Sequence, residues 1–423
     1  MKLALVGHGT RGDVQPLVCT GVELKKRGHE VRLVAPLNMR DLVERSGLTY
    51  VPSAVNVQEV LQDPSAQKML ADGRWLAFLR WLEEEDRRNR EPLHESWLAA
   101  IEGSEAMLAH PMAEEALCAI GAHFKIPTLT LYYGPFLPSS ELPAVFLTPR
   151  NLGPFNRMSH RFLLRLIRRA AAPGVCALRK QLGLPMTREL YSEQRIRRKL
   201  PCLLSYSPLI APRPTDYPEQ ATFCSGIAPS AELKGAWGEQ GISPELEDWL
   251  SQGPAPFYLG FGSMPVLKPE QTLEVARRAV RALGARAIIG AGWSAISSAT
   301  DRQLRIVQGV DHAALFARCR GAVHHGGAGT TYASLRAGVP TLVASVFADQ
   351  PFWGSRVSQL GVGGTIPFRQ LNEKNLTRAL SRLDDDRTRK QAAILGKRLQ
   401  AENGAREASD AVEALLPGMK APQ

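Results

Sequence analysis

The segment from Val323 to Thr331 constrains the fold of this chain most, because it joins an apolar run to a helical pattern through a glycine-rich junction. It reads Val-His-His-Gly-Gly-Ala-Gly-Thr-Thr. The Gly-Ala-Val that precedes the histidines predicts the end of a buried strand. Residues 331–337 predict a helix that stops at Gly338 and Pro340. A helix N-terminus presents free N–H groups and the positive end of the helix dipole. The junction therefore favours a bound anion such as a diphosphate.

Strand and helix patterns alternate along the chain, which is typical of parallel α/β sheets. The first series of predicted strands comprises residues 2–6, 30–35, 106–109 and 128–131. The second series comprises residues 257–262, 287–290, 304–307, 322–324 and 341–344. Helical patterns lie between them, at 14–27, 42–46 and 113–123, and fill most of 373–416. We predict an α/β fold of two Rossmann-like domains whose parallel sheets face an interdomain cleft.

With 423 residues the chain is too long for one ordinary core, so more than one domain is expected. Residues 200–245 are rich in Pro, Gly and Ser and have little periodicity, which indicates a domain boundary. We expect an N-terminal domain over 1–215, a linker over 216–245 and a second domain over 246–400. Over 401–423 we expect a helix that packs back toward the N-terminal domain, followed by a tail.

Composition excludes several classes of protein. No apolar run approaches the roughly 18 residues that a membrane-spanning helix needs. The 6 cysteines have no paired spacing, which indicates reduced thiols in a cytoplasmic protein and not a disulfide framework or a zinc site. The acidic runs at 83–86 and 384–386 are expected to be solvated surface, so we predict no metal ion.

The net charge of +11 is concentrated in one segment. Residues 150–199 hold 13 Lys/Arg and 2 Asp/Glu, so the rest of the chain has 39 of each sign. Within 157–169, one helical face carries Arg157, Arg161, Arg165, Arg168 and Arg169, and the other carries Phe162, Leu163, Leu166 and Ile167. Such a helix lies on an anionic membrane or packs as an ordinary surface helix on its own domain, and both interpretations stay open. No nucleic-acid partner is expected, because the chain has no recognisable nucleic-acid-binding module.

The turn Gly7-His8-Gly9-Thr10-Arg11-Gly12 follows the first predicted strand directly and fits the G-x-G-x-x-G pattern of dinucleotide-binding enzymes. An NAD(P)-dependent oxidoreductase is therefore an alternative. Such an enzyme needs an acidic residue at the end of the second strand to hold the ribose. Residues 34–38, Val-Ala-Pro-Leu-Asn, contain none, which weighs against this alternative.

Several motifs in order resemble one family. Residues 9–16 read Gly-Thr-Arg-Gly-Asp-Val-Gln-Pro, residues 261–264 read Phe-Gly-Ser-Met, and Gly-Trp stands at 292–293. With 324–331 and Asp349-Gln350, these resemble the GT-B-fold, family 1 glycosyltransferases, in the branch that contains bacterial natural-product and sterol enzymes. The resemblance covers nearly the full length. It implies an inverting transfer from a nucleotide sugar, with no cofactor and no required metal.

Glycosyl transfer by single displacement requires a base that takes a proton from the acceptor hydroxyl. Asp13 lies just past the first predicted strand, at a helix N-terminus. The family has His or Asp at this place, so the resemblance implies that Asp13 is the general base. Asp is also a preferred helix cap, and a capping role stays open. His8 is a competing base. Residues 108–111, where members with a His base often hold a partner carboxylate, read Leu-Ala-His-Pro.

The resemblance implies a donor site in the second half of the chain. Its residues are Ser263, Trp293, Val310, His325, Gly327, Ala328, Gly329, Thr330, Asp349, Gln350 and Trp353. His325 and the N–H groups after it would bind the diphosphate, and Val310 would contact the nucleobase through its backbone. Asp349 and Gln350 would bind the sugar hydroxyls, and Trp353 would shape that pocket.

The acceptor site is the least specific prediction. Aromatic side chains at Trp75, Phe78, Trp81, Tyr132 and Phe136 line an apolar pocket in the N-terminal domain or belong to its core. A pocket of this kind favours a lipophilic acceptor such as a sterol, polyketide or glycolipid. We expect UDP-glucose as the donor, with a dTDP-deoxysugar such as rhamnose as the alternative, and a monomer or weak dimer. A nucleotide-sugar epimerase shares this fold and is a further alternative.

Overall fold

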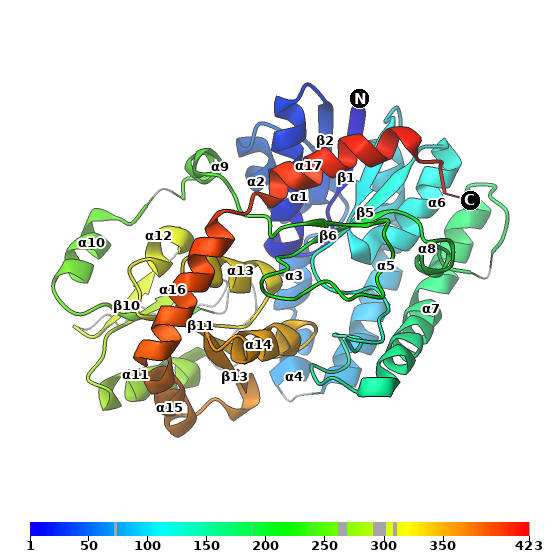
Figure 1. The fold of residues 1–423 in the computed structure, drawn as a ribbon. Helices are drawn as coiled ribbons and strands as arrows, with labels where there is room; N and C mark the ends of the chain where they lie inside the picture. The colour runs from blue at the N-terminus through cyan, green and yellow to red at the C-terminus, as the bar shows by residue number, and fades with distance from the viewer. Residues whose placement is uncertain are drawn as a thin grey trace.

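The computed structural model describes residues 1–71, 74–187, 189–239, 241–260, 269–290, 302–307 and 311–422. Two parallel sheets, each covered by helices, form an N-terminal and a C-terminal domain (Figure 1). The N-terminal sheet has seven strands in the order β3-β2-β1-β4-β5-β6-β7. Its strands are β1 Lys2–Val6, β2 Glu30–Pro36, β3 Thr49–Ser53, β4 Ala106–Ala109, β5 Thr128–Tyr132, β6 Cys202–Ser205 and β7 Ala221–Cys224.

The C-terminal sheet has six strands in the order β10-β9-β8-β11-β12-β13. Its strands are β8 Phe257–Gly260, β9 Ala287–Gly290, β10 Leu304–Val307, β11 Gly321–His324, β12 Thr341–Ser345 and β13 Gly363–Pro367. The central strands are buried along their whole length, because helices cover both faces of a parallel sheet. The predicted α/β fold of two Rossmann-like domains is confirmed.

Helices of the N-terminal half are α1 Arg11–Lys26, α2 Arg40–Arg45, α3 Val57–Gln62, α4 Pro64–Ala71, α5 Trp75–Ile101, α6 Glu114–Phe124, α7 Asn156–Gln181 and α8 Tyr191–Arg198. The later helices are α9 Ala231–Ala236, α10 Pro244–Ser251, α11 Pro269–Ala282, α12 His312–Phe316, α13 Ala328–Arg336, α14 Gln350–Gln359, α15 Glu373–Leu383, α16 Asp386–Gln400 and α17 Gly404–Leu415.

The region expected to be a linker contains regular structure. β7 lies at 221–224, inside the predicted linker 216–245, and forms the edge of the N-terminal sheet. β6 lies within 200–245 as well, and both strands have only four residues. Strands this short between Pro- and Gly-rich segments carry almost no periodicity, which is why the pattern missed them. The chain leaves the N-terminal sheet after Cys224.

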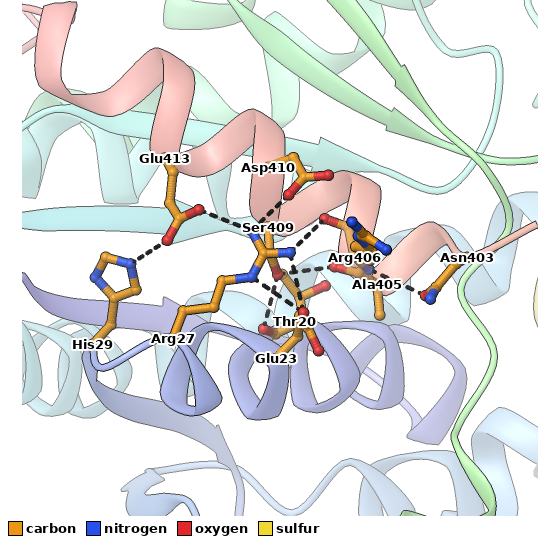
Figure 2. Close-up of polar contacts among 10 residues, drawn as sticks. All are labelled: Thr20, Glu23, Arg27, His29, Asn403, Ala405, Arg406, Ser409, Asp410 and Glu413. Carbon is orange, nitrogen blue, oxygen red and sulfur yellow. Dashed lines mark hydrogen bonds and ion pairs between the residues drawn. The ribbon is translucent and has the colours of Figure 1, made fainter.

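The C-terminal helix α17 lies across the N-terminal domain against α1 (Figure 1). Ala408, Val412 and Leu416 belong to the same apolar cluster as β1 and β2. Figure 2 shows the polar side of this contact, where the Arg27 guanidinium reaches Glu23, Asp410 and Glu413.

A second apolar cluster continues from one domain into the other. It joins Tyr132, Leu204 and Tyr206 of the N-terminal domain to Phe352 and Trp353 of α14. The rings of Tyr206 and Trp353 are 6.2 Å apart. The two domains therefore share part of their core, beside the residues that were expected to bind the donor.

Candidate active site

Asp13 occupies the third position of α1 and caps it. Its Oδ2 accepts hydrogen bonds from the backbone N–H of Thr10 at 2.7 Å and from the Thr10 hydroxyl at 3.1 Å. Gly9 makes room for this arrangement with φ +123°, and a Cβ there would lie 2.4 Å from Asp13 Oδ2. The capping role is therefore present in the structure. It leaves the other carboxylate oxygen free for a second contact.

That second contact is His110, which follows β4. Its Nε2 lies 3.3 Å from Asp13 Oδ1. The other ring nitrogen, Nδ1, accepts a hydrogen bond from the backbone N–H of Met112 at 3.3 Å. Since Nδ1 is an acceptor, the proton of a neutral ring sits on Nε2 and points at Asp13. The hydroxyl of Tyr133, just after β5, donates to the Asp13 carbonyl oxygen at 2.9 Å.

The surroundings of Asp13 keep it ionised. Partial burial raises the pKa of its carboxyl group, and the contacts with His110 and Thr10 lower it by more, so the net shift is downward. About a third of the side chain, 30%, remains exposed. Asp13 is therefore an accessible carboxylate at neutral pH. His8, the competing base, instead lies with its ring edge against Trp97, at 5.8 Å between centroids.

The glycine-rich junction forms the N-terminus of α13, as its pattern indicated, although the helix begins at Ala328 and not at Thr331. The first intrahelical bond of the junction runs from the Thr331 N–H to the Gly327 carbonyl at 2.9 Å. The N–H groups of Ala328, Gly329 and Thr330 precede it and point out of the helix end. Gly326 has φ +93°, and a Cβ there would lie 2.3 Å from Val343, so only glycine fits this turn.

The two histidines before this helix differ. His324 ends β11 and is fully buried, with its ring nitrogens bonded to Ser334 Oγ at 3.1 Å and to the Gly326 N–H at 3.0 Å. His325 is half-buried, and its Nδ1 has no hydrogen-bond partner among the described residues. Burial lowers the pKa of His325 to about 4, so its ring is neutral at physiological pH. His325 is thus the histidine that remains available to a ligand.

Asp349 lies at the N-terminus of α14, and Trp353 Nε1 donates to its Oδ2 at 2.7 Å. Burial raises the pKa of this carboxyl group to about 6, against the lowering effect of the Trp353 hydrogen bond. The preceding residue, Ala348, has φ +57°, a strained conformation for a residue with a Cβ. Strain of this kind is retained where the surrounding structure needs a side chain in one place.

Gln350 and Trp353 lie behind Asp349. Gln350 is 5% exposed, and its side-chain oxygen accepts hydrogen bonds from the backbone N–H groups of Val346 and Phe347. Trp353 is 2% exposed and belongs to the interdomain cluster. Both side chains therefore shape the loop that presents Asp349.

The two halves of the site meet across the domain boundary. α1, which carries Asp13, contacts α13. The ring of Phe78 in α5 lies 6.3 Å from that of Phe347, two residues before Asp349. The negative charge of Asp13 contributes to the raised pKa of Asp349. A carboxylate on one domain and a helix N-terminus on the other thus flank a common region.

The aromatic residues expected around an acceptor fall into different places. Tyr132 is 7% exposed and its hydroxyl donates to Glu114 Oε2 at 2.7 Å, so of its two predicted placements the core holds and the open pocket does not. A buried ion pair of Glu114 with Arg195 holds it there. Phe78 is also buried, at the domain boundary. Trp81 and Phe136 are half-buried, and Trp81 stacks on Phe78. The side chain of Trp75 lies outside the described residues, as do Ser263, Trp293 and Val310.

His110 and Tyr133 were not among the predicted site residues. His110 follows β4, which is adjacent to β1 in the sheet, and Tyr133 follows β5, the next strand. The order of the strands in the sheet brings both residues to Asp13, and that order cannot be predicted from the pattern of each strand alone. The position of a polar residue directly after a buried strand was the available signal.

Comparison with known proteins identifies the family. Residues 3–82 match the model of the glycosyltransferase family 28 N-terminal domain. Residues 287–415 match the model of the C-terminal domain of erythromycin biosynthesis protein CIII-like proteins. A glycosyltransferase of Mycobacterium leprae (strain TN) is 30% identical over 388 residues, which cover 89% of this chain and 87% of the relative. The chain belongs to the family 1 GT-B glycosyltransferases.

Two further comparisons show a relative in sequence and a solved structure that this glycosyltransferase resembles. A sterol 3-beta-glucosyltransferase of Arabidopsis thaliana is 30% identical over 439 residues, which cover 99% of the present glycosyltransferase and 66% of the plant protein. The crystal structure of the glycosyltransferase VinC in complex with dTDP has a TM-score of 0.68 and 18% identity, and covers 99% of this chain and 100% of VinC. The family resemblance and the enzyme class predicted from the motifs are confirmed. The family excludes the dehydrogenase alternative.

Proposed function

We propose that this glycosyltransferase moves a hexose from UDP-glucose to a hydroxyl group of a lipophilic small molecule such as a sterol, polyketide or glycolipid. The observation that carries the proposal is the Asp13–His110 pair, at 3.3 Å, in which Asp13 lies on α1, a helix that contacts α13. The pair offers a carboxylate base, and α13 offers free amides for a leaving diphosphate. An inverting transfer needs both groups, one on each side of the anomeric carbon.

The reaction is a single displacement with inversion. Oδ2 of Asp13 is occupied by Thr10, so Oδ1, beside His110, keeps a lone pair for the proton of the acceptor hydroxyl. The acceptor oxygen forms its bond to the anomeric carbon as the bond from that carbon to the diphosphate oxygen breaks. The nucleoside diphosphate leaves with the electron pair. Its charge is met by His325 and by the N–H groups at the start of α13.

The sugar is held from the C-terminal domain in this proposal. Asp349 accepts hydrogen bonds from its hydroxyl groups, and Gln350 and Trp353 keep the Asp349 loop in place. Neutral donors and a helix dipole supply the positive potential, so the reaction requires neither a metal ion nor a cofactor. Activity that persists undiminished in EDTA supports this part of the proposal, and loss of activity that Mg²⁺ or Mn²⁺ restores contradicts it.

The substitution Asp13→Asn tests the base. Asn keeps the capping geometry at α1 but does not accept the proton, so turnover falls by about two orders of magnitude or more. Binding of UDP, measured by calorimetry, stays within a factor of about two, since the donor site lies on the other domain. Asp385→Asn is the control, because Asp385 also caps a helix with its carboxylate, accepting from the N–H groups of Arg387 and Thr388 at the N-cap of α16, at an exposed position. Turnover that survives in Asp13→Asn would show that Asp13 is only a cap.

A second nucleotide is a candidate for the donor. The plant relative is a glucosyltransferase, and the VinC structure contains dTDP, so a dTDP-deoxysugar such as rhamnose is the second candidate. A calorimetric screen of UDP, dTDP and their sugars without an acceptor distinguishes them. A nucleotide sugar that the protein epimerises in the absence of any acceptor would contradict transferase activity and favour an epimerase.

A further inference from the structure

The first half of α7 exposes large apolar side chains that the enzyme's proposed chemistry does not use. Met158, Phe162 and Leu166 are 58%, 52% and 43% exposed and recur every fourth residue, so they form one stripe along the helix. A soluble protein rarely exposes several large apolar side chains side by side unless something binds to them. α7 runs along the outer side of the N-terminal domain, away from the C-terminal domain (Figure 1).

The loop before α7 exposes further large apolar side chains. Phe146, Leu147, Leu152 and Phe155 are between 38% and 60% exposed. The residues that lead into this loop are fixed against the helix, since the Ala144 N–H donates to Ser159 Oγ at 2.8 Å and His160 Nε2 contacts the Leu142 carbonyl at 3.0 Å. We call the loop 146–155 together with residues 156–169 the α7 face.

A stripe of arginines runs beside the apolar stripe. Arg157, Arg161 and Arg165 recur with the same four-residue spacing, offset by one position, and all are exposed. Arg157 reaches Asp216 at 3.4 Å, and Arg168 pairs with Glu193. In the described part of the chain, Arg161, Arg165 and Arg169 have no ion-pair partner. The α7 face therefore offers uncompensated positive charge directly along its apolar edge.

We propose that the α7 face docks on an anionic lipid bilayer. The apolar side chains would enter the boundary between headgroups and acyl chains, while the arginine stems extend along the surface and hold their guanidinium groups at the phosphates. Charge complementarity selects this partner, because a lipid headgroup layer accepts an apolar stripe and a basic stripe side by side. No helix in the described ranges is long and apolar enough to span a membrane.

Sedimentation with vesicles tests the proposal on the full chain. Wild type should bind vesicles of phosphatidylcholine and phosphatidylglycerol at roughly 7:3 much more tightly than pure phosphatidylcholine, and salt should weaken the binding. The triple variant Arg161→Gln, Arg165→Gln, Arg169→Gln should lose roughly tenfold or more of its partition coefficient. The double variant Phe162→Ser, Leu166→Ser should lose a comparable factor, because the inserted apolar area is gone.

Matched controls lie on the other domain. Lys374, Arg378 and Arg382 on α15 are exposed at the same four-residue spacing, so their triple change to Gln removes the same charge elsewhere. Ile394, 63% exposed on α16, gives Ile394→Ser as the apolar control. Both controls should bind vesicles as wild type does. Equal losses in test and control variants would show general electrostatics and overturn the proposal.

Two further outcomes would also overturn it. Wild type that does not sediment with anionic vesicles excludes the bilayer as the partner. A dimer in lipid-free buffer, seen by analytical ultracentrifugation and dissociated by Phe162→Ser, Leu166→Ser, would make the α7 face a contact between two copies of this chain. Thermal melting of each variant separates loss of binding from loss of folding.

Discussion

At the scale of single residues, Asp13 combines two roles. It completes the cap of α1 through Thr10, and it offers its second oxygen beside His110. A capping aspartate is placed by local backbone geometry, so the carboxylate stands in a defined position before any substrate arrives. The same contacts that position it also keep it ionised.

His110 controls the ionisation of Asp13, and removing it should appear in the pH dependence. His110 lowers the pKa of the Asp13 carboxyl group, and burial raises it. In His110→Ala the burial effect is less opposed, so we expect the acid limb of the kcat/KM profile to move to higher pH and kcat to fall. His110→Gln, which keeps an N–H donor, should restore part of both. An acid limb that does not move would leave His110 with a purely structural role.

Asp349 shows a site residue that costs stability. Its pKa is raised from 3.8 to about 6, so the folded protein holds this proton more tightly than the unfolded chain does. The stability that the protonated Asp349 carboxyl group contributes is fully present below pH 3.8 and is lost as the pH rises through about 6, where the group becomes a buried charge. Asp349→Asn keeps the oxygen that Trp353 bonds and removes the charge. Above this pH range we expect Asp349→Asn to be more stable than wild type by at most about 3 kcal/mol, and therefore to melt at a higher temperature.

Differential scanning fluorimetry at about pH 5 and about pH 8 measures this difference, which should be larger at the higher pH. Asp385→Asn, at an exposed cap, should show no such trend. If wild type and Asp349→Asn differ equally at the two values, Asp349 does not titrate in the interval. Catalytic activity of Asp349→Asn should fall in the same preparation, since the substitution weakens the sugar contact that we propose for Asp349.

At the scale of elements, our proposal places the diphosphate of the donor at the N-terminus of α13, beside His325. The ring of His325 is neutral, because burial lowers its pKa to about 4, so it contributes one hydrogen bond and not a full charge. We expect His325→Ala to weaken binding of UDP or dTDP by roughly fivefold to tenfold, the range of a single neutral hydrogen bond. Isothermal titration calorimetry measures the change. Unchanged affinity would remove His325 from the diphosphate site.

The elements also show where pattern reading succeeds. Strands β1, β4 and β9 lie at the residues that their apolar runs predict. β3, β6, β7 and β13 were not predicted. β3, β7 and β13 form edges of their sheets, and their residues are partly exposed, so no apolar run indicates them. β6 is buried but has only four residues within the Pro- and Gly-rich segment 200–245. The predicted start of the helix after β1 was late, because its first turn, with Arg11, Gly12 and Asp13, is polar.

At the scale of the whole molecule, α17 ties the end of the chain to the N-terminal domain (Figure 2). Arg27 bonds Glu23 on its own helix and Asp410 and Glu413 on α17, while His29 also contacts Glu413. We expect Arg27→Met to lower stability by about 1 kcal/mol, or roughly 2–4 °C in melting temperature. Lys26→Met, which loses only an exposed pair with Glu232, is the control and should change little. If Arg27→Met leaves the melting temperature unchanged, apolar packing alone holds α17 against the N-terminal domain.

The sequence by itself determined the class of fold, the family and the two segments at which we propose that the chemistry takes place. These are local properties, because an apolar strand, a glycine turn and a helix N-terminus each lie within a dozen neighbouring residues. Only the tertiary structure decided that His110 and Tyr133 stand beside Asp13, that Tyr132 is core, and that Trp353 lies in a cluster shared by both domains. Those contacts join residues that are far apart in the sequence, 120 positions for Tyr133 and Asp13, and strand order and domain packing set them. The exposure of the α7 face was also decided only by the tertiary structure, since amphipathic spacing does not reveal which side of a helix its own domain covers.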